Sequence, residues 1–205
     1  MDDVEMDLSA AFATSLETPG HVRIAEGLGY SRAWLYDTPQ QSPDVWMTLA
    51  LAAKGTAHIG LGPGVLVPTL RHPMVNAAAT AALEHLAPGR VAVGFGTGFT
   101  GRRAMGQSKP IPWSYMASYI SVFRALLRGE TVEWDGRLLR MLHDDTAAAS
   151  RPVEVPVYIG ALGPKGLQVT HDLADGLFVA SRRPRGREGL RQRRLPRLGH
   201  RPGRR

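Results

Sequence analysis

The chain has 205 residues, enough for one domain with a substantial core, and a formal net charge of +7. The charge is unevenly distributed, because residues 182–205 hold 11 of the 25 Lys and Arg but only one acidic residue, which leaves residues 1–181 with a net charge of −3. The absence of Cys excludes disulfides and thiolate metal sites. No run approaches the ~18 consecutive apolar residues of a membrane helix, and no basic segment followed by an apolar run opens the chain, so we expect a soluble, cytoplasmic protein without a membrane partner.

Short apolar runs that end in Gly, Pro, Ser or Asp alternate with longer Ala- and Leu-rich segments of helical spacing. The predicted strands are 4–14, 32–37, 58–68, 89–98, 155–163 and 175–181. The predicted helices are 19–30, 43–57, 72–87, 114–129 and 164–174, the second of them with Ser42 as its N-cap and Pro43 at its first position. The run 131–141 differs, because Asp135 and Gly136 separate two short apolar stretches, and it predicts an inserted hairpin.

About six strand and helix pairs in alternation predict an α/β fold with a parallel sheet, since parallel neighbours need crossover connections. Both an open doubly wound sheet and a (β/α)8 TIM barrel fit this pattern, although six units are two short of a barrel. The Arg-rich segment 182–205 begins where a seventh unit is expected and has neither the apolar period nor the caps of one.

A glycine-rich motif, "GTGFTG", occupies residues 96–101 and matches the G-x-G-x-x-G turn of dinucleotide-binding folds. The match follows the fourth predicted strand rather than the first, no apolar helix is predicted directly after it, and no acidic residue lies about 20 positions further on. We therefore interpret it as a glycine-rich loop that passes close to a ligand or to another loop.

Two further strand ends are candidate ligand sites, because α/β folds bind ligands at the carboxyl ends of their strands. "GPGVLVPTLRHP" (62–73) implies an unusual backbone, with Arg71 and His72 facing either a phosphate or solvent, and His72 is more typical of a helix cap. "YIGALGPKGLQ" (158–168) is the better anion site, because a helix N-terminus and Lys165 follow the strand; the alternative is an ordinary tight loop.

Hydrolase and zinc motifs such as G-x-S-x-G and H-E-x-x-H are absent, and the seven His are scattered without metal-ligand spacing, so we expect no metal site. Asp37 ends the second predicted strand, where it could contact a cofactor or cap the next turn. The candidate sites offer mainly backbone groups and few titratable side chains to a ligand. This favours a chemistry performed by a cofactor.

The segments "AEGLGYSRAWLYD", "LAAKGTAHIGLGPGVLVPTLRHPMVNAAATAALEHLAPGRVAVGFGTG" and "VPVYIGALGPKGLQVTHDLADGLFVAS" resemble the luciferase-like flavin and deazaflavin oxidoreductases. The branch they resemble is that of the coenzyme F420-dependent methylenetetrahydromethanopterin reductase-like proteins, over residues 20–181. The resemblance implies a TIM barrel, here incomplete, with 131–141 as its insertion. It also implies coenzyme F420 or FMN at the strand ends, hydride transfer to a small organic substrate, and a possible homodimer.

The resemblance also assigns cofactor-binding positions. Gly64 and Val65 match a bulge that presses on the cofactor ring, often through a non-prolyl cis peptide. Thr69 lies in the loop that follows, and Thr97 and Gly98 match the loop after the fourth strand. Asp37 matches an acid placed at the deazaflavin. The phosphate-binding loop, beside Lys165, is matched by Gly160, Ala161, Leu162, Gly163 and Pro164. The related sugar dehydrogenases carry His directly after that acid, whereas this chain has Thr38 and Pro39.

Three functions follow as hypotheses. The first is an F420-dependent oxidoreductase, whole or C-terminally truncated, and the second is an FMN-dependent monooxygenase of the same superfamily. The third is binding of nucleic acid or an acidic surface by residues 182–205, through salt-dependent contacts of their Arg residues. That segment lacks aromatic residues for base stacking and has the composition of a shifted reading frame, so we expect a domain at 1–181, a disordered tail at 182–205 and no nucleic-acid partner.

Overall fold

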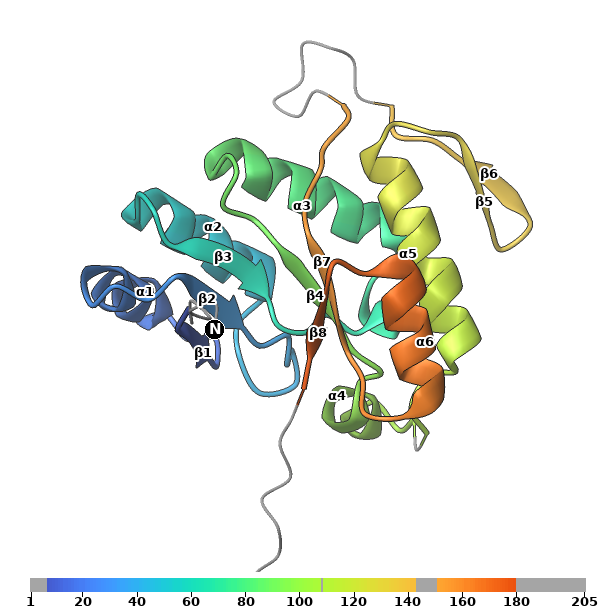
Figure 1. Ribbon diagram of the computed structural model, residues 1–205, viewed down its shortest axis with the longest axis horizontal. Helices are drawn as coiled ribbons and strands as arrows, with labels where there is room; N and C mark the ends of the chain where they lie inside the picture. The colour runs from blue at the N-terminus through green and yellow to red at the C-terminus, as the bar shows by residue number, and fades with distance from the viewer. Residues whose placement is uncertain (1–6, 108, 143–150, 180–205) are drawn as a thin grey trace, which may run out of the picture.

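The computed structural model describes residues 7–107, 109–142 and 151–179, so the expected disordered tail lies outside the described residues. Six strands run parallel and in chain order, as the alternating pattern predicts (Figure 1). They are β1 (Ser9–Phe12), β2 (Arg32–Leu35), β3 (Gly60–Pro63), β4 (Val93–Phe95), β7 (Val157–Gly160) and β8 (Gly176–Phe178). Parallel bridges pair Leu61 with Val91 and Leu66 with Phe95, and so join the β1-β2-β3 sheet to the β4-β7-β8 sheet.

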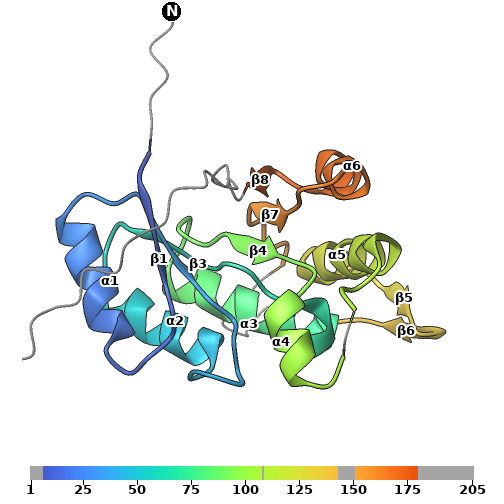
Figure 2. The same cartoon turned by 90° about the horizontal axis from the view of Figure 1, so that it is seen from below.

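The helices follow one another around the sheet in the same order as the strands (Figure 2). They are α1 (Thr18–Gly27), α2 (Val45–Gly55), α3 (Pro73–Leu86), α4 (Phe99–Ala104), α5 (Trp113–Leu127) and α6 (Pro164–Leu173), with a short 3₁₀ turn, η1 (Pro68–Leu70), before α3. α1 packs on α2, α2 on α3, α3 on α5, and α5 on α6. This is the arrangement of a (β/α) barrel, but among the described residues no pairing joins β1 to β8, and the barrel is not closed.

Local interactions set the helix starts, in one case differently from the prediction. α2 begins after Asp44, whose carboxylate accepts hydrogen bonds from the amides of Trp46 (2.9 Å) and Met47 (3.1 Å), so the predicted N-cap at Ser42 is wrong. His72 caps α3, since its Nδ1 accepts from the amide of Met74, as its position before Pro73 suggests. A six-residue helix that was not predicted, α4, begins at Phe99 inside "GTGFTG".

The predicted insertion is an antiparallel hairpin of β5 (Val132–Trp134) and β6 (Arg137–Leu139). Its two-residue turn places Asp135 at φ 50° and Gly136 at φ 71°, the positive angles that an Asp-Gly hairpin turn favours. The hairpin packs on α5, where the Trp134 and Tyr115 rings meet edge to face at 5.6 Å.

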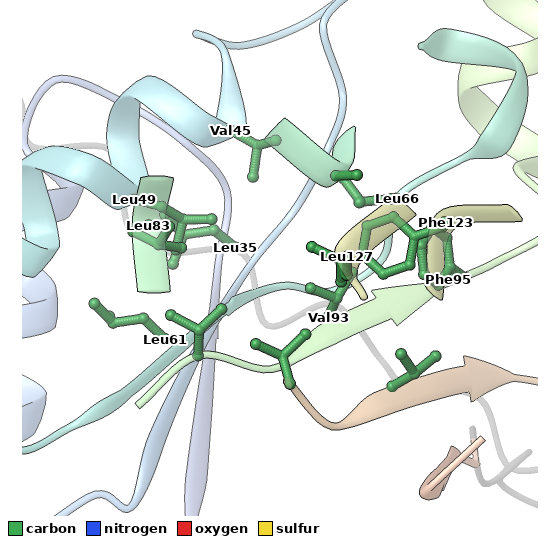
Figure 3. Packing of buried hydrophobic residues seen from close by; sticks show 14 of the residues in the cluster. Leu35, Val45, Leu49, Leu61, Leu66, Leu83, Val93, Phe95, Phe123 and Leu127 are labelled. Atoms are coloured by element: carbon green, nitrogen blue, oxygen red, sulfur yellow. The ribbon is translucent and has the colours of Figure 1, made fainter. Parts of the chain in front are cut away.

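The main core lies between the sheet and its helices, as Figure 3 shows for residues from both layers. Phe95 of β4 is fully buried and packs edge to face on Phe123 of α5 at 5.2 Å and on Tyr119 at 5.8 Å. Leu35 and Leu61 from the strands and Leu49 and Leu83 from α2 and α3 complete a continuous apolar layer. No helix of the described residues is long and apolar enough to cross a membrane.

We predict that Gly62→Ala lowers the free energy of unfolding by about 1 to 3 kcal/mol, measured by urea denaturation. A Cβ at Gly62 would collide with the backbone carbonyl oxygen of Ala92 on the adjacent strand, which cannot move away as a flexible side chain could. Gly27→Ala at the end of α1 is the control, because a Cβ there has no neighbour within 4 Å. Equal unfolding midpoints for the two variants would contradict the close strand packing.

Candidate functional site

A cavity of about 620 Å³ opens at the carboxyl ends of the strands, where barrel folds bind their ligands. Every parallel strand contributes to it, either directly or through the loop that follows the strand. Its lining comprises Ala11, Trp34, Tyr36, Gly64, Val65, Thr97, Trp113, Gly160, Ala161, Leu162, Gly163, Phe178 and Val179. Most of these residues are apolar or glycine, so the cavity offers shape and backbone groups rather than charge.

Aromatic rings form the floor of the cavity. The ring of Trp34 lies 4.8 Å from Phe178 and 5.3 Å from Tyr158, edge to face in both pairs. Gly94 makes room for this cluster, because a Cβ there would lie 2.6 Å from the Phe178 ring. Side chains from β2, β7 and β8 thus pack together on one face of the sheet, in direct contact with the backbone of β4 at Gly94.

One wall of the cavity is the peptide bond between Gly64 and Val65, which is a non-prolyl cis peptide. The position agrees with the one expected from the resemblance. The adjacent Gly96 is required to be small, because a Cβ there would lie 2.5 Å from a Val65 methyl group. Val65 is thereby held between its own strand end and the start of the β4–α4 loop.

Another wall of the cavity is the loop between β7 and α6. Gly160, Ala161, Leu162 and Gly163 all line the cavity, and Gly163 is the N-cap residue of α6 without a side-chain capping bond. Gly166 allows α6 to approach the cavity, because a Cβ there would lie 2.5 Å from the ring of Trp113. Pro164 and Lys165 are exposed in the first turn of α6 and lie outside the lining.

The β4–α4 and β3–α3 loops contain the remaining predicted positions. Thr97 lines the cavity, whereas Gly98 adopts φ 74° and packs against Val67, where a side chain would collide. Thr69 does not line the cavity; its hydroxyl accepts a hydrogen bond from Arg102 of α4 at 2.8 Å. The structure therefore brings Thr97 together with the two walls and places Gly98 and Thr69 behind them.

Asp37 lies on the other face of β2 from Trp34 and Tyr36 and does not line the cavity. Its side chain is 1% exposed and pairs with Arg71 at 2.5 Å. Arg71 also pairs with Asp44 at 2.7 Å, so it faces two carboxylates rather than the phosphate or solvent expected from the sequence. Burial raises the pKa of Asp37, although the hydrogen bond and charge of Arg71 oppose this shift.

Asp44 and Tyr119, which belong to the same cluster, also have shifted pKa values. Burial alone would raise the pKa of Asp44, but the hydrogen bond from Arg71 and the amides of α2 lower it overall. Burial likewise raises the pKa of Tyr119 well above its ordinary value, so this hydroxyl is a neutral hydrogen-bonding group at physiological pH.

Several cavity residues were not predicted from the sequence, and they include all the aromatic ones. Trp34 of β2, Tyr36 just after it, Trp113 of α5 and Phe178 of β8 come from distant parts of the sequence that only the folded chain brings together. Among the residues that the structure describes, no group of three His, Cys, Asp or Glu side chains is arranged to hold a metal ion.

Comparison with known proteins extends this description. Residues 7–195 match the family model of the luciferase-like monooxygenases. The 5,10-methylenetetrahydromethanopterin reductase of Methanolobus tindarius is 30% identical over 171 residues, which are 83% of this chain and 52% of the relative. The F420-dependent glucose-6-phosphate dehydrogenase of Beutenbergia cavernae is 34% identical over 191 residues, 85% of this chain and 55% of the relative.

The structure of the coenzyme F420-dependent tetrahydromethanopterin reductase from Methanopyrus kandleri superposes with a TM-score of 0.71 at 26% sequence identity. The superposition covers 85% of this chain and 55% of that one. The chain thus spans about half the length of the curated relatives that it matches.

Proposed function

Because the chain belongs to the luciferase-like monooxygenase family, we propose that it binds coenzyme F420 in the strand-end cavity and transfers a hydride between the reduced deazaflavin and a small organic substrate. The observation that carries the proposal is the cavity itself, which is lined by the cis Gly64–Val65 peptide, the Gly160–Gly163 loop and aromatic rings. The F420-dependent relatives support the choice of cofactor.

The residues that line the cavity suit coenzyme F420. A cavity of about 620 Å³ is within the usual range of ~300 to 1,000 Å³ for a small-molecule site, and its floor of aromatic edges suits a planar ring. The first amides of α6 have no side-chain cap and adjoin the cavity at Gly163, so they suit a phosphate oxygen. Lys165 in the same turn adds a positive charge nearby.

In this proposal the protein contributes positioning rather than a nucleophile. The bound deazaflavin would supply the hydride chemistry. Val65 and the Gly64–Val65 peptide would support one face of the ring, and Thr97 would offer a hydroxyl at its edge. The Gly160–Gly163 loop would close over the phosphate, and Trp113 would exclude water from that side.

Isothermal titration of the purified chain with coenzyme F420 and with FMN, in parallel, tests this proposal. Saturable heat with F420 that exceeds the response to FMN is the expected result, with one site per chain. A clear response to FMN alongside none to F420 would refute the choice of cofactor. Titration of Gly163→Val, which places a branched side chain in the cavity wall, controls for binding elsewhere.

The same cavity also fits FMN, and the matching family model is that of a monooxygenase, so an FMN-dependent monooxygenase is the second candidate. Oxygen consumption that depends on reduced FMN separates it from the first, because hydride transfer from a reduced deazaflavin consumes no oxygen.

We also propose that the chain forms a homodimer through α2 and α3. Apolar residues at positions 75, 79, 82 and 86 follow a four-three-four spacing on α3, and Val75 is 53% exposed. Met47 and Leu51 are exposed apolar residues of α2, which packs on α3. A self-complementary apolar surface is the usual basis of a twofold dimer.

Leu51→Glu is expected to shift the chain from dimer to monomer, because the carboxylate would be buried without a partner at the interface. Analytical ultracentrifugation measures the change. Leu138→Glu, on the exposed face of β6, is the matched control and is expected to leave the mass unchanged. A wild-type chain that sediments as a monomer at high concentration would refute the dimer.

A further inference from the structure

Behind the cavity, a closed ring of hydrogen bonds connects four elements of the fold. The indole Nε1 of Trp46 donates to Asn76 Oδ1 at 3.1 Å, and Asn76 Nδ2 donates to the Tyr119 hydroxyl at 2.8 Å. The Tyr119 hydroxyl donates to the backbone oxygen of Arg71 at 2.8 Å. The Arg71 guanidinium then donates to Asp44, whose other oxygen accepts from the amide of Trp46, which closes the ring.

A branch of the ring leads from Arg71 to Asp37, which follows the end of β2. Asn76 and Tyr119 are fully buried and Asp37 nearly so, and every polar group named here has a partner. Satisfied networks of this kind are rigid, because any movement leaves a buried donor or acceptor unpaired. Arg71 is held both by its side chain, through Asp37 and Asp44, and by its backbone oxygen, through Tyr119.

Arg71 ends the β3–α3 loop, which begins with the cavity wall at Gly64 and Val65. The start of this loop is tied to β4, where the amide of Leu66 donates to Gly94 and the amide of Gly96 donates to Leu66. Its middle contains η1, where the Leu70 amide donates to Val67 at 2.9 Å and the Thr69 hydroxyl accepts from Arg102 of α4 at 2.8 Å. Arg71 ties the far end of the loop to β2, α2 and α5.

We propose that Arg71 is a positioning residue that fixes the β3–α3 loop and thereby holds the Gly64–Val65 wall of the cavity in place for its ligand. Arginine suits this role because its two terminal nitrogens reach carboxylates on two different elements at once. A lysine ammonium at this position would engage the two carboxylates as a single point charge. The consequence for cofactor binding rests on the proposed function, whereas the fixing of the loop does not.

The test combines hydrogen exchange of the ligand-free chain with cofactor titration. In Arg71→Met, amides of residues 66–71 are expected to exchange about tenfold faster, and the dissociation constant for F420 to rise about tenfold, because the loop is no longer preorganised. Arg71→Lys is expected to lie between this variant and the wild type. Arg128→Met is the matched control, because Arg128 forms an exposed ion pair with Glu130 away from the cavity.

Two further variants separate positioning from general stability. Arg71→Met leaves the buried carboxylate of Asp37 without its partner, and adding Asp37→Asn removes that charge. The double variant is expected to be more thermally stable than Arg71→Met alone, while the amides of 66–71 still exchange fast. Tyr119→Phe keeps both ion pairs and removes the bond to the Arg71 backbone together with the acceptor of Asn76 Nδ2, so we expect a smaller acceleration of the same amides.

Unchanged exchange of residues 66–71 in Arg71→Met, relative to Arg128→Met, would overturn the proposal. Exchange that accelerates equally in 66–71 and in α6 would also overturn it, because the effect would then be general destabilisation. If the wild type binds neither F420 nor FMN, the proposed function fails, and the exchange of the ligand-free chain still decides the role of Arg71.

Discussion

Phe95→Ala is expected to lower the free energy of unfolding by about 3 to 5 kcal/mol, as large-to-small substitutions of buried aromatic residues do. Phe95 is fully buried, and its ring packs on Phe123 and Tyr119 of α5, so its removal leaves a cavity between the sheet and the helix layer. Its backbone lies directly before the Gly96 and Thr97 loop. The loss of stability therefore affects the part of the sheet that supports the candidate site.

Chemical denaturation with paired measurement of tryptophan fluorescence and circular dichroism gives the value. Phe99→Ala is the matched control, because Phe99 is 64% exposed on α4 and its substitution is expected to change stability by no more than about 0.5 kcal/mol. Similar losses in the two variants would contradict a core centred on β4 and α5.

Leu162→Glu is expected to weaken the binding of coenzyme F420 by about ten- to a hundredfold, because it places a negative charge beside the predicted phosphate position. Leu162 lines the cavity and is 62% exposed, so the fold has room for the longer polar side chain. It lies one residue before the N-cap of α6, whose positive dipole end would otherwise favour the phosphate.

Dissociation constants measured at low and high ionic strength separate charge from shape. Leu162→Gln has nearly the same shape without the charge and is expected to bind much more tightly than Leu162→Glu, with the difference shrinking as salt is added. Leu167→Glu, on an exposed part of α6 outside the cavity lining, is the second control. Equal affinities for the Glu and Gln variants would place the phosphate elsewhere.

The order and type of the main elements could be predicted from the sequence, because each has a strong local signal. The six strands and the Asp135–Gly136 hairpin agree with the apolar runs and the turn chemistry. The cis bond at Gly64–Val65 agrees with the resemblance rather than with any local rule. The start of α2 was misjudged because Ser42, Pro43 and Asp44 all suit a helix start, and only the geometry of Asp44 Oδ1 selects one.

The alternation within β2 is a signal that could have corrected the placement of Asp37. In "RAWLYD" successive side chains point to opposite faces, so Trp34 and Tyr36 share one face, while Leu35 and Asp37 share the other. Since Leu35 belongs to the core beneath the helices, Asp37 follows it there and requires a buried partner. Its assignment to the deazaflavin remains a prediction that the burial of its side chain does not support.

The partners of Arg71 and the aromatic residues of the cavity could not be predicted, because they depend on contacts between distant parts of the chain. Arg71 lies 34 residues from Asp37 and 27 from Asp44, and the Tyr119 hydroxyl that holds its backbone is 48 residues away. Trp113 faces the cavity only because Gly166 lets α6 approach it closely. No local pattern in the sequence encodes either arrangement.

Tryptophan fluorescence during titration with coenzyme F420 tests the central claim most directly. Trp34 and Trp113 line the cavity, whereas Trp46 and Trp134 do not, so bound ligand is expected to quench the first pair selectively. A saturable decrease in the wild type, much reduced when Trp34 and Trp113 are both replaced by Phe, is the predicted result. A decrease that persists in the Trp34→Phe, Trp113→Phe variant, or no saturable change with F420, would contradict the cavity as the cofactor site.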